Sequence, residues 1–137
     1  MDLRSLIAPH LVVHAHCDIP CGIYDPTAAK VAADTVAKMV EKITAASGTD
    51  EASRNTFVRS ITVKEEHAQI CKKELLILWT DYFKPEHLEK YPKLHETFWK
   101  AAKLCSKNKQ TVDAQAATDL QAAVKEISDI FWATKKP

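Results

Sequence analysis

The chain has little glycine and few aromatic residues. Only two of its 137 residues are glycine, and aromatic residues make up 7% of the total. A turn-rich β architecture needs more glycine, whereas many alanines within a 46% apolar content favour helices. The length is that of one ordinary domain with one core.

An excess of charge of either sign is also missing. Lysine and arginine total 19, aspartate and glutamate total 18, and no basic run occurs. The sequence therefore predicts no nucleic-acid partner and no charged surface for a membrane. No apolar run approaches the roughly 20 residues that span a bilayer, so no membrane-spanning segment is predicted.

Apolar residues recur at helical spacing in four segments. Asp25 and Pro26 are typical of a helix start, and Gly48 is expected as the C′ residue that ends this first helix. A second helix is predicted from about residue 51 to residue 82, because Lys84 precedes Pro85 and helices rarely continue there. Its expected inward stripe includes Phe57, Cys71 and Leu75, and ends at Tyr82.

The second half of the chain continues the pattern. A short connection over residues 85–92 leads to a third helix that Pro92 opens, and the polar segment SKNKQ (106–110) is expected to be a linker. Thr111 or Asp113 should cap a fourth helix with Val112 among its inward residues. The predicted fold is all-α, an antiparallel up-down four-helix bundle with an N-terminal metal-binding hook.

Four cysteines divide into two groups. Cys71 and Cys105 fall on apolar helix faces, where free cysteine usually behaves as a small buried hydrophobe. Cys17 and Cys21 are close in sequence and precede the first helix. A Cys-x-x-x-Cys pair alone fits a disulfide, half of a zinc site or two unrelated thiols.

The surrounding segment HCDIPCGIYD (residues 16–25) adds further donors. With a free amine at His16, the terminal nitrogen, the next amide nitrogen and the Cys17 thiolate close two chelate rings. Cys21 completes a near-planar N2S2 set after a turn at Pro20, and the His16 ring can approach from the axial side. This geometry favours nickel or copper over zinc, which prefers a tetrahedron.

The same segment resembles the N-terminal hook of the nickel-containing superoxide dismutases, in which the histidine is the first residue of the mature enzyme. The segment WTDYFKPEHLEKYP (79–92) is similar to the family's second signature, and IFWATKK (130–136) to its C-terminus. The resemblance spans essentially all of residues 16–137.

It implies an enzyme that disproportionates superoxide to dioxygen and hydrogen peroxide by cycling Ni(II)/Ni(III), with one nickel ion per subunit of a homohexamer. The resemblance assigns His16, Cys17 and Cys21 as nickel ligands and Pro20 as the turn residue of the hook. It places Asp18 and Tyr24 at the approach to the metal with Tyr82 nearby, and it assigns Lys84 to holding the hook.

The fifteen residues before His16 are expected to be a leader, cleaved between Ala15 and His16 by a dedicated peptidase. Residues 16–137 would then form the dismutase domain, with the hook at 16–24 and the bundle at 25–137. A weak charged region and a marginal apolar core make the leader a poor secretory signal, so a cytoplasmic location is predicted, with export as the alternative.

One departure from the family pattern concerns the axial imidazole. Many members orient it with a glutamate on the first helix and an arginine on the second, and the aligned positions here are Ala32 and His67. His67 is therefore predicted to support the imidazole. Two rival functions are a nickel or copper carrier without turnover and a thiol-redox module that uses Cys17 and Cys21.

Overall fold

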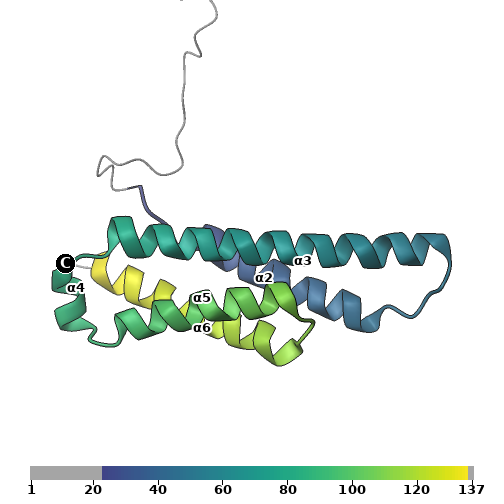
Figure 1. Cartoon of the computed structure of the whole chain (residues 1–137). Helices are drawn as coiled ribbons and strands as arrows, with labels where there is room; N and C mark the ends of the chain where they lie inside the picture. The colour runs from purple at the N-terminus through teal and green to yellow at the C-terminus, as the bar shows by residue number, and fades with distance from the viewer. Residues whose placement is uncertain (1–22, 136–137) are drawn as a thin grey trace, which may run out of the picture.

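The computed structural model describes residues 23–135, so the predicted leader and the hook residues 16–22 lie outside it. Four long helices dominate the described part: α2 (Thr27–Ala45), α3 (Glu51–Ile77), α5 (Leu94–Gln110) and α6 (Ala114–Lys135). A π-helical turn, η1 (Leu78–Tyr82), continues α3, and the short helix α4 (Pro85–Lys90) links it to α5 (Figure 1).

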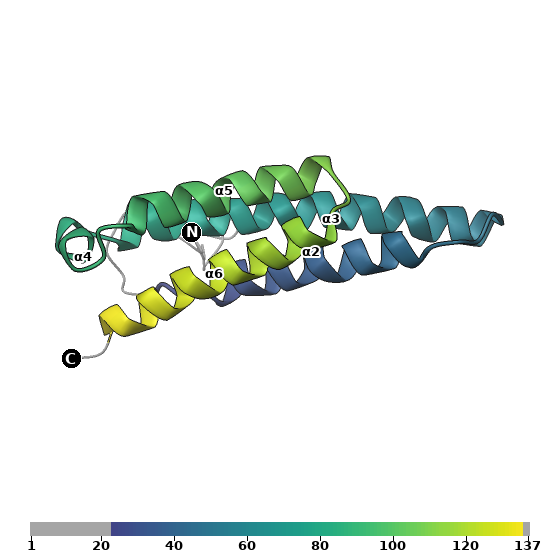
Figure 2. The same ribbon diagram turned by 90° about the horizontal axis from the view of Figure 1, so that it is seen from below.

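The four long helices run alternately up and down, and each packs against two others. α2 contacts α3 and α6, and α5 contacts the same two helices, so the order around the bundle is α2, α3, α5, α6 (Figures 1 and 2). The start of α2, the end of α3, all of α4 and the end of α6 lie at one end of the bundle. The predicted all-α, up-down four-helix bundle is thus confirmed.

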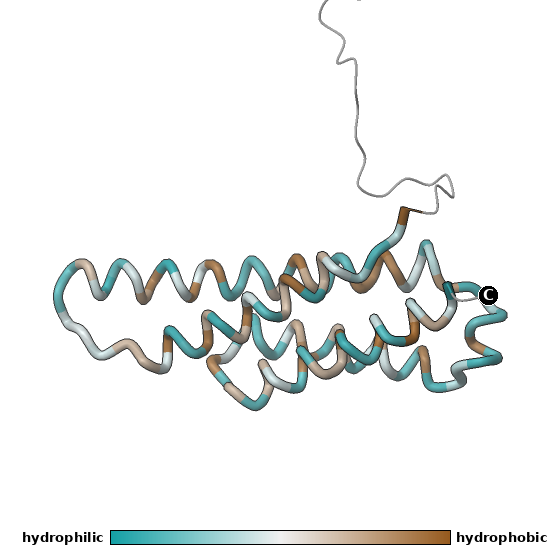
Figure 3. Tube along the Cα trace, turned by 180° about the vertical axis from the view of Figure 1, so that it is seen from behind, coloured by the Kyte–Doolittle hydropathy of each residue, from teal (hydrophilic) through white to brown (hydrophobic). Residues whose placement is uncertain are grey.

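The core is an apolar stripe from every long helix. Apolar and polar positions alternate along each helix, as the hydropathy colouring shows (Figure 3). The largest fully buried apolar side chains include Phe131, Leu75, Leu78, Leu94 and Leu120. No helix within residues 23–135 is long and apolar enough to cross a membrane.

Local capping explains where α2 and α3 begin. Asp25, the residue before the N-cap Pro26, accepts the backbone N–H of Thr27 at 2.6 Å, and the N-cap Asp50 of α3 accepts that of Ser53 at 3.0 Å. Gly48 is not the C′ residue that was predicted, because α2 ends at Ala45 and the next residue is extended. Glycine is needed at position 48 because a Cβ there would lie 2.1 Å from the Ser53 hydroxyl oxygen.

The predicted linker at residues 106–110 is also wrong, because α5 continues to Gln110. The fully buried Asn108 holds the last turn: its amide donates to the carbonyls of Leu104 and Ala116 at 3.0 and 2.8 Å. The buried Lys64 ammonium reaches the same turn from α3. Long-range contacts therefore extend a helix whose local sequence is polar.

Two expected core residues face outward. Phe57 is 39% exposed and Val112 is 47% exposed. Phe57 lies in the first turns of α3, and Val112 lies in the connection before α6, where Asp113 accepts the Ala116 N–H at 3.0 Å as the N-cap.

Candidate metal centre and its supporting aromatic cluster

The predicted nickel ligands His16, Cys17 and Cys21 lie outside the described residues, as do Asp18 and Pro20. Within residues 23–135, no three histidine, cysteine, aspartate or glutamate side chains gather as a metal site. The donor types of the hook suit a soft divalent metal, since thiolate and imidazole are ligands for nickel and copper.

Tyr24, the last residue of the predicted hook, is a predicted site residue that the structure describes. Its ring lies beside that of Tyr82, with centroids 5.8 Å apart and planes at 55°. Both side chains are half-buried. The structure therefore brings together Tyr24, predicted to line the approach to the metal, and Tyr82, predicted to lie near it, although they are 58 positions apart in sequence.

The π turn η1 sets the direction of Tyr82. The backbone N–H of Phe83 donates to the Leu78 carbonyl at 3.1 Å, five residues earlier, which is the π pattern. Such a turn inserts one residue into an α-helix, and π turns are frequent at functional sites. Because of the extra residue, the direction of the Tyr82 side chain does not follow from the helical spacing of apolar residues along α3.

Three aromatic rings besides that of Tyr24 surround Tyr82. The Tyr82 ring lies 4.5 Å from Phe131, 5.0 Å from Phe83 and 5.7 Å from His87, the last nearly parallel at 13°. We call this group the Tyr82 cluster: Tyr24, Tyr82, Phe83, His87 and Phe131. Phe131 is fully buried, so the cluster joins the predicted site directly to the core.

The phenol of Tyr82 is bound by the end of α6. Its oxygen lies 2.6 Å from the Thr134 hydroxyl oxygen, which lies 2.6 Å from the Phe131 carbonyl oxygen. The Lys135 ammonium lies over the same ring, 4.9 Å from its centroid. The sequence predicted no role for Thr134 or Lys135, although both lie in the C-terminal motif at residues 130–136.

Lys84 lies at the start of α4 and is exposed. Its backbone N–H donates to Nδ1 of His87 at 3.0 Å, and its carbonyl accepts the His87 N–H at 2.9 Å. Nδ1 of His87 is therefore unprotonated, and the imidazole that stacks on Tyr82 caps the helix. The predicted contact of the Lys84 side chain with the hook stays a prediction.

His67 lies elsewhere on α3. Its Nδ1 is 2.9 Å from the Val63 carbonyl oxygen, so Nδ1 carries a proton and donates to its own helix. Fifteen residues separate it from Tyr82, which is roughly 22 Å along a helix axis at 1.5 Å per residue. The structure does not bring His67 to the Tyr82 cluster. Ala32, its predicted counterpart on α2, is buried.

The two remaining cysteines face each other across α3 and α5. Cys71 and Cys105 are both buried and reduced, and their thiols hydrogen-bond to each other. That hydrogen bond, together with burial, raises the pKa of Cys71 far above its ordinary value. A neutral, inaccessible thiol is a poor ligand, in line with the predicted packing role.

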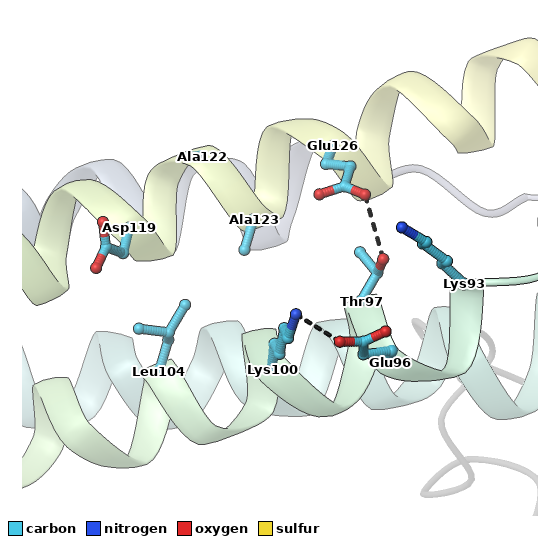
Figure 4. Close-up of a pocket in the computed structure, with 9 residues that line it drawn as sticks. All are labelled: Lys93, Glu96, Thr97, Lys100, Leu104, Asp119, Ala122, Ala123 and Glu126. Carbon is cyan, nitrogen blue, oxygen red and sulfur yellow. Dashed lines mark hydrogen bonds and ion pairs between the residues drawn. The ribbon is translucent and has the colours of Figure 1, made fainter.

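A groove of about 440 Å³ lies between α5 and α6 (Figure 4). Within it, Lys100 pairs with Glu96 at 2.6 Å, and Glu126 accepts a hydrogen bond from Thr97 at 3.2 Å. None of the predicted site residues lines it. The groove is separate from the Tyr82 cluster.

Comparison with known proteins gives a consistent answer. Residues 11–135 match the family described as nickel-containing superoxide dismutase. Proteins named superoxide dismutase [Ni], from Streptomyces coelicolor and Streptomyces seoulensis, are each 40% identical to the chain over 134 residues, covering 98% of both chains.

Solved structures agree in fold and length. A nickel-containing superoxide dismutase with nickel ligation corresponding to the oxidised state is 38% identical with a TM-score of 0.79, and the alignment covers 89% of this chain and 100% of that one. A native nickel superoxide dismutase structure is 37% identical with a TM-score of 0.78, covering 88% and 100%.

Proposed function

The chain belongs to the family of nickel-containing superoxide dismutases, and we propose that His16, Cys17 and Cys21 hold its nickel ion. The protein is an enzyme that disproportionates superoxide to dioxygen and hydrogen peroxide with nickel as its cofactor. The nickel or copper carrier is not favoured, because the relatives that match over nearly the whole chain are named as dismutases.

The observation that carries the ligand assignment is the Tyr24–Tyr82 contact. Only two residues separate Cys21 from Tyr24, which limits their Cα separation to about 11 Å of extended chain. A metal held by Cys21 therefore lies near the Tyr82 cluster. None of the described residues offers a competing cluster of metal ligands.

The donor set suits the chemistry. Nickel, when bound, supplies one-electron oxidation and reduction, and thiolates favour its higher oxidation state. We assign the two thiolates, the His16 imidazole and its terminal amine to holding the metal, one ion per subunit. Pro20 would direct the turn between Cys17 and Cys21.

The remaining residues act on the substrate and its protons. Tyr24 and Asp18 are proposed to line the approach for superoxide, with Tyr82 behind them. Formation of peroxide consumes two protons, and the phenol of Tyr24 is proposed to guide one of them. Lys84 would hold the hook, because it lies two residues after Tyr82 at the exposed start of α4.

We further propose that a dedicated peptidase cleaves between Ala15 and His16 in the cytoplasm. The alignment with the oxidised-state structure covers 89% of 137 residues, about 122, and residues 16–137 also number 122. The agreement in length supports a mature chain that begins at His16. The cleavage matters chemically, because an amide nitrogen at this position is a poor ligand unless it loses its proton.

A homohexamer is proposed as the assembly. Large apolar side chains exposed on the single chain support an association of copies, among them Trp99 at 62%, Val31 at 57% and Trp132 at 47% exposed. Sedimentation of the nickel-loaded protein would test it, and a monomer at micromolar concentration would contradict it.

The test of the ligand and maturation proposals is the mass and metal content of the native protein. We expect a mass that begins at His16 and one nickel per chain. Chains expressed to begin at His16 should be active when supplied with nickel, whereas chains with one extra residue before His16 should fold with the same helical circular dichroism but bind nickel weakly. An uncleaved chain with stoichiometric nickel and full activity would refute the maturation proposal.

A further inference from the structure

The hydrogen bonds at the end of α6 determine the direction of the Tyr82 proton. A threonine hydroxyl has one proton to donate, and a carbonyl oxygen can only accept. Since the Thr134 oxygen lies 2.6 Å from the Phe131 carbonyl oxygen, the Thr134 proton points there. The second contact of this hydroxyl, 2.6 Å to the Tyr82 oxygen, then takes its proton from the phenol.

The Tyr82 ring itself has little freedom. Phe131 and Phe83 pack on it at 4.5 and 5.0 Å, His87 stacks on it at 5.7 Å, and the Lys135 ammonium covers it at 4.9 Å. Packing thus fixes the ring, and rotation of the hydroxyl proton is the remaining freedom. Thr134 removes it.

We propose that Thr134 is a positioning residue that holds the Tyr82 proton away from the substrate approach, so that Tyr82 presents only oxygen lone pairs there. This inference rests on the proposed placement of Tyr82 near the metal. Its consequence is that Tyr82 discourages anions from binding at the substrate approach.

The test variant is Thr134→Val, which keeps the shape of the side chain and removes the hydroxyl oxygen that accepts the Tyr82 proton. The Tyr82 hydroxyl can then rotate and donate to an anion, so azide should inhibit at a concentration lower by about threefold to tenfold, the range that one hydrogen bond supplies. Thr134→Ser should restore the original inhibition. Thr118→Val is the matched control, because Thr118 makes the same kind of bond to its own helix at an exposed position of α6.

A second readout does not need the metal. The tyrosine doublet in ultraviolet resonance Raman spectra reports whether a phenol donates or accepts, and subtraction of the Tyr82→Phe spectrum isolates Tyr82. In metal-free protein we expect a donor signature that Thr134→Val changes and that Thr134→Ser and Thr118→Val retain. The azide effect of Thr134→Val should vanish in the Tyr82→Phe background.

Unchanged Raman spectra in Thr134→Val would overturn the proposal, as would failure of Thr134→Ser to restore azide inhibition. An unchanged azide response with an altered Raman signature would also overturn it, because the bond would then have no effect at the approach. The ligand assignment is tested separately by the nickel content of Cys17→Ser. If this variant retained nickel, the ligand assignment would fail whatever the outcome for Thr134.

Discussion

The Lys64 ammonium of α3 donates to the Asn108 carbonyl of α5, and also to the carbonyls of Lys109 and Thr111 at 3.1 and 2.8 Å. These carbonyls lie at the C-terminal end of α5, where a helix leaves its last carbonyls without internal partners. Lys64 is 2% exposed, and burial lowers the pKa of its ammonium. A cation from a neighbouring helix therefore caps α5.

Lys64→Met should destabilise the bundle by about 2–3 kcal/mol, because it removes charge-assisted hydrogen bonds and leaves buried carbonyls unpaired. The measurement is urea unfolding followed by circular dichroism. Lys73→Met, an exposed position on the same helix, is the control and should change stability by less than about 0.5 kcal/mol. Equal losses in both variants would contradict the capping role.

Asp113→Asn should lower stability in a pH-dependent way. The Lys107 ammonium, 2.8 Å away, and then the Ala116 N–H hold the pKa of Asp113 below its ordinary value of 3.8. A lowered pKa in the folded state means that stabilisation is present above 3.8 and is lost as pH falls through the folded pKa. Thermal melts of both proteins should differ at about pH 6 and converge towards about pH 2. A constant difference would show that the charge is irrelevant.

The four cysteines should separate by function. Cys17→Ser and Cys21→Ser should lose nickel, thiolate-to-nickel absorption and activity while keeping the helical circular dichroism. Cys71→Ala and Cys105→Ala should keep all of these and lose on the order of 1 kcal/mol of stability each. Because the Cys71 and Cys105 thiols interact by a hydrogen bond, the double variant should lose less stability than the two single variants together. Loss of nickel in Cys71→Ala would overturn the division.

Tyr24→Phe should keep nickel, because the phenol is proposed to lie near the metal rather than on it. Loss of a donor at the approach should weaken azide inhibition, the opposite of the effect expected for Thr134→Val. Tyr91→Phe, a tyrosine outside the Tyr82 cluster, provides the control. Identical kinetics across pH and azide concentration would reduce Tyr24 to a packing role.

His67 is predicted to support the axial imidazole. His67→Ala should alter the axial Ni(III) EPR signal of the nickel-loaded enzyme, and His67→Arg should preserve or sharpen it. The measurement decides between the alignment and the fold, because His67 lies roughly 22 Å along α3 from Tyr82 whereas the metal is proposed to lie near the Tyr82 cluster. Identical spectra in all three proteins would remove His67 from the site.

The helices could be predicted from the sequence, because each carries apolar residues at helical spacing and a residue that ends a helix, such as Pro85 after Lys84. The prediction failed where contacts between residues that are distant in sequence determine the secondary structure. The polar segment 106–110 is helical because Lys64, more than 40 positions earlier, donates to the carbonyls of Asn108 and Lys109. No local pattern reveals such a cap.

Some residues of the site could likewise be predicted from the sequence, and others could not. Motif resemblance selected Tyr24 and Tyr82, and the structure places them side by side. It did not select Thr134 or assign a role to His87, because a threonine near a C-terminus and a histidine after proline are individually unremarkable in sequence. Their roles follow from the π turn of Leu78–Tyr82 and from the contacts of Tyr82 with the end of α6.

The Tyr82 cluster joins residues from both ends of the described chain, since Tyr24 precedes α2 and Phe131 lies near the end of α6. During synthesis the ribosome releases the last turn of α6 after every other helix has emerged. The contacts that hold Tyr82 are thus completed only after α6 has emerged, later than every other described helix. Affinity tags for purification are best joined through a spacer, because a fusion directly after Lys135 would crowd the turn that anchors the phenol.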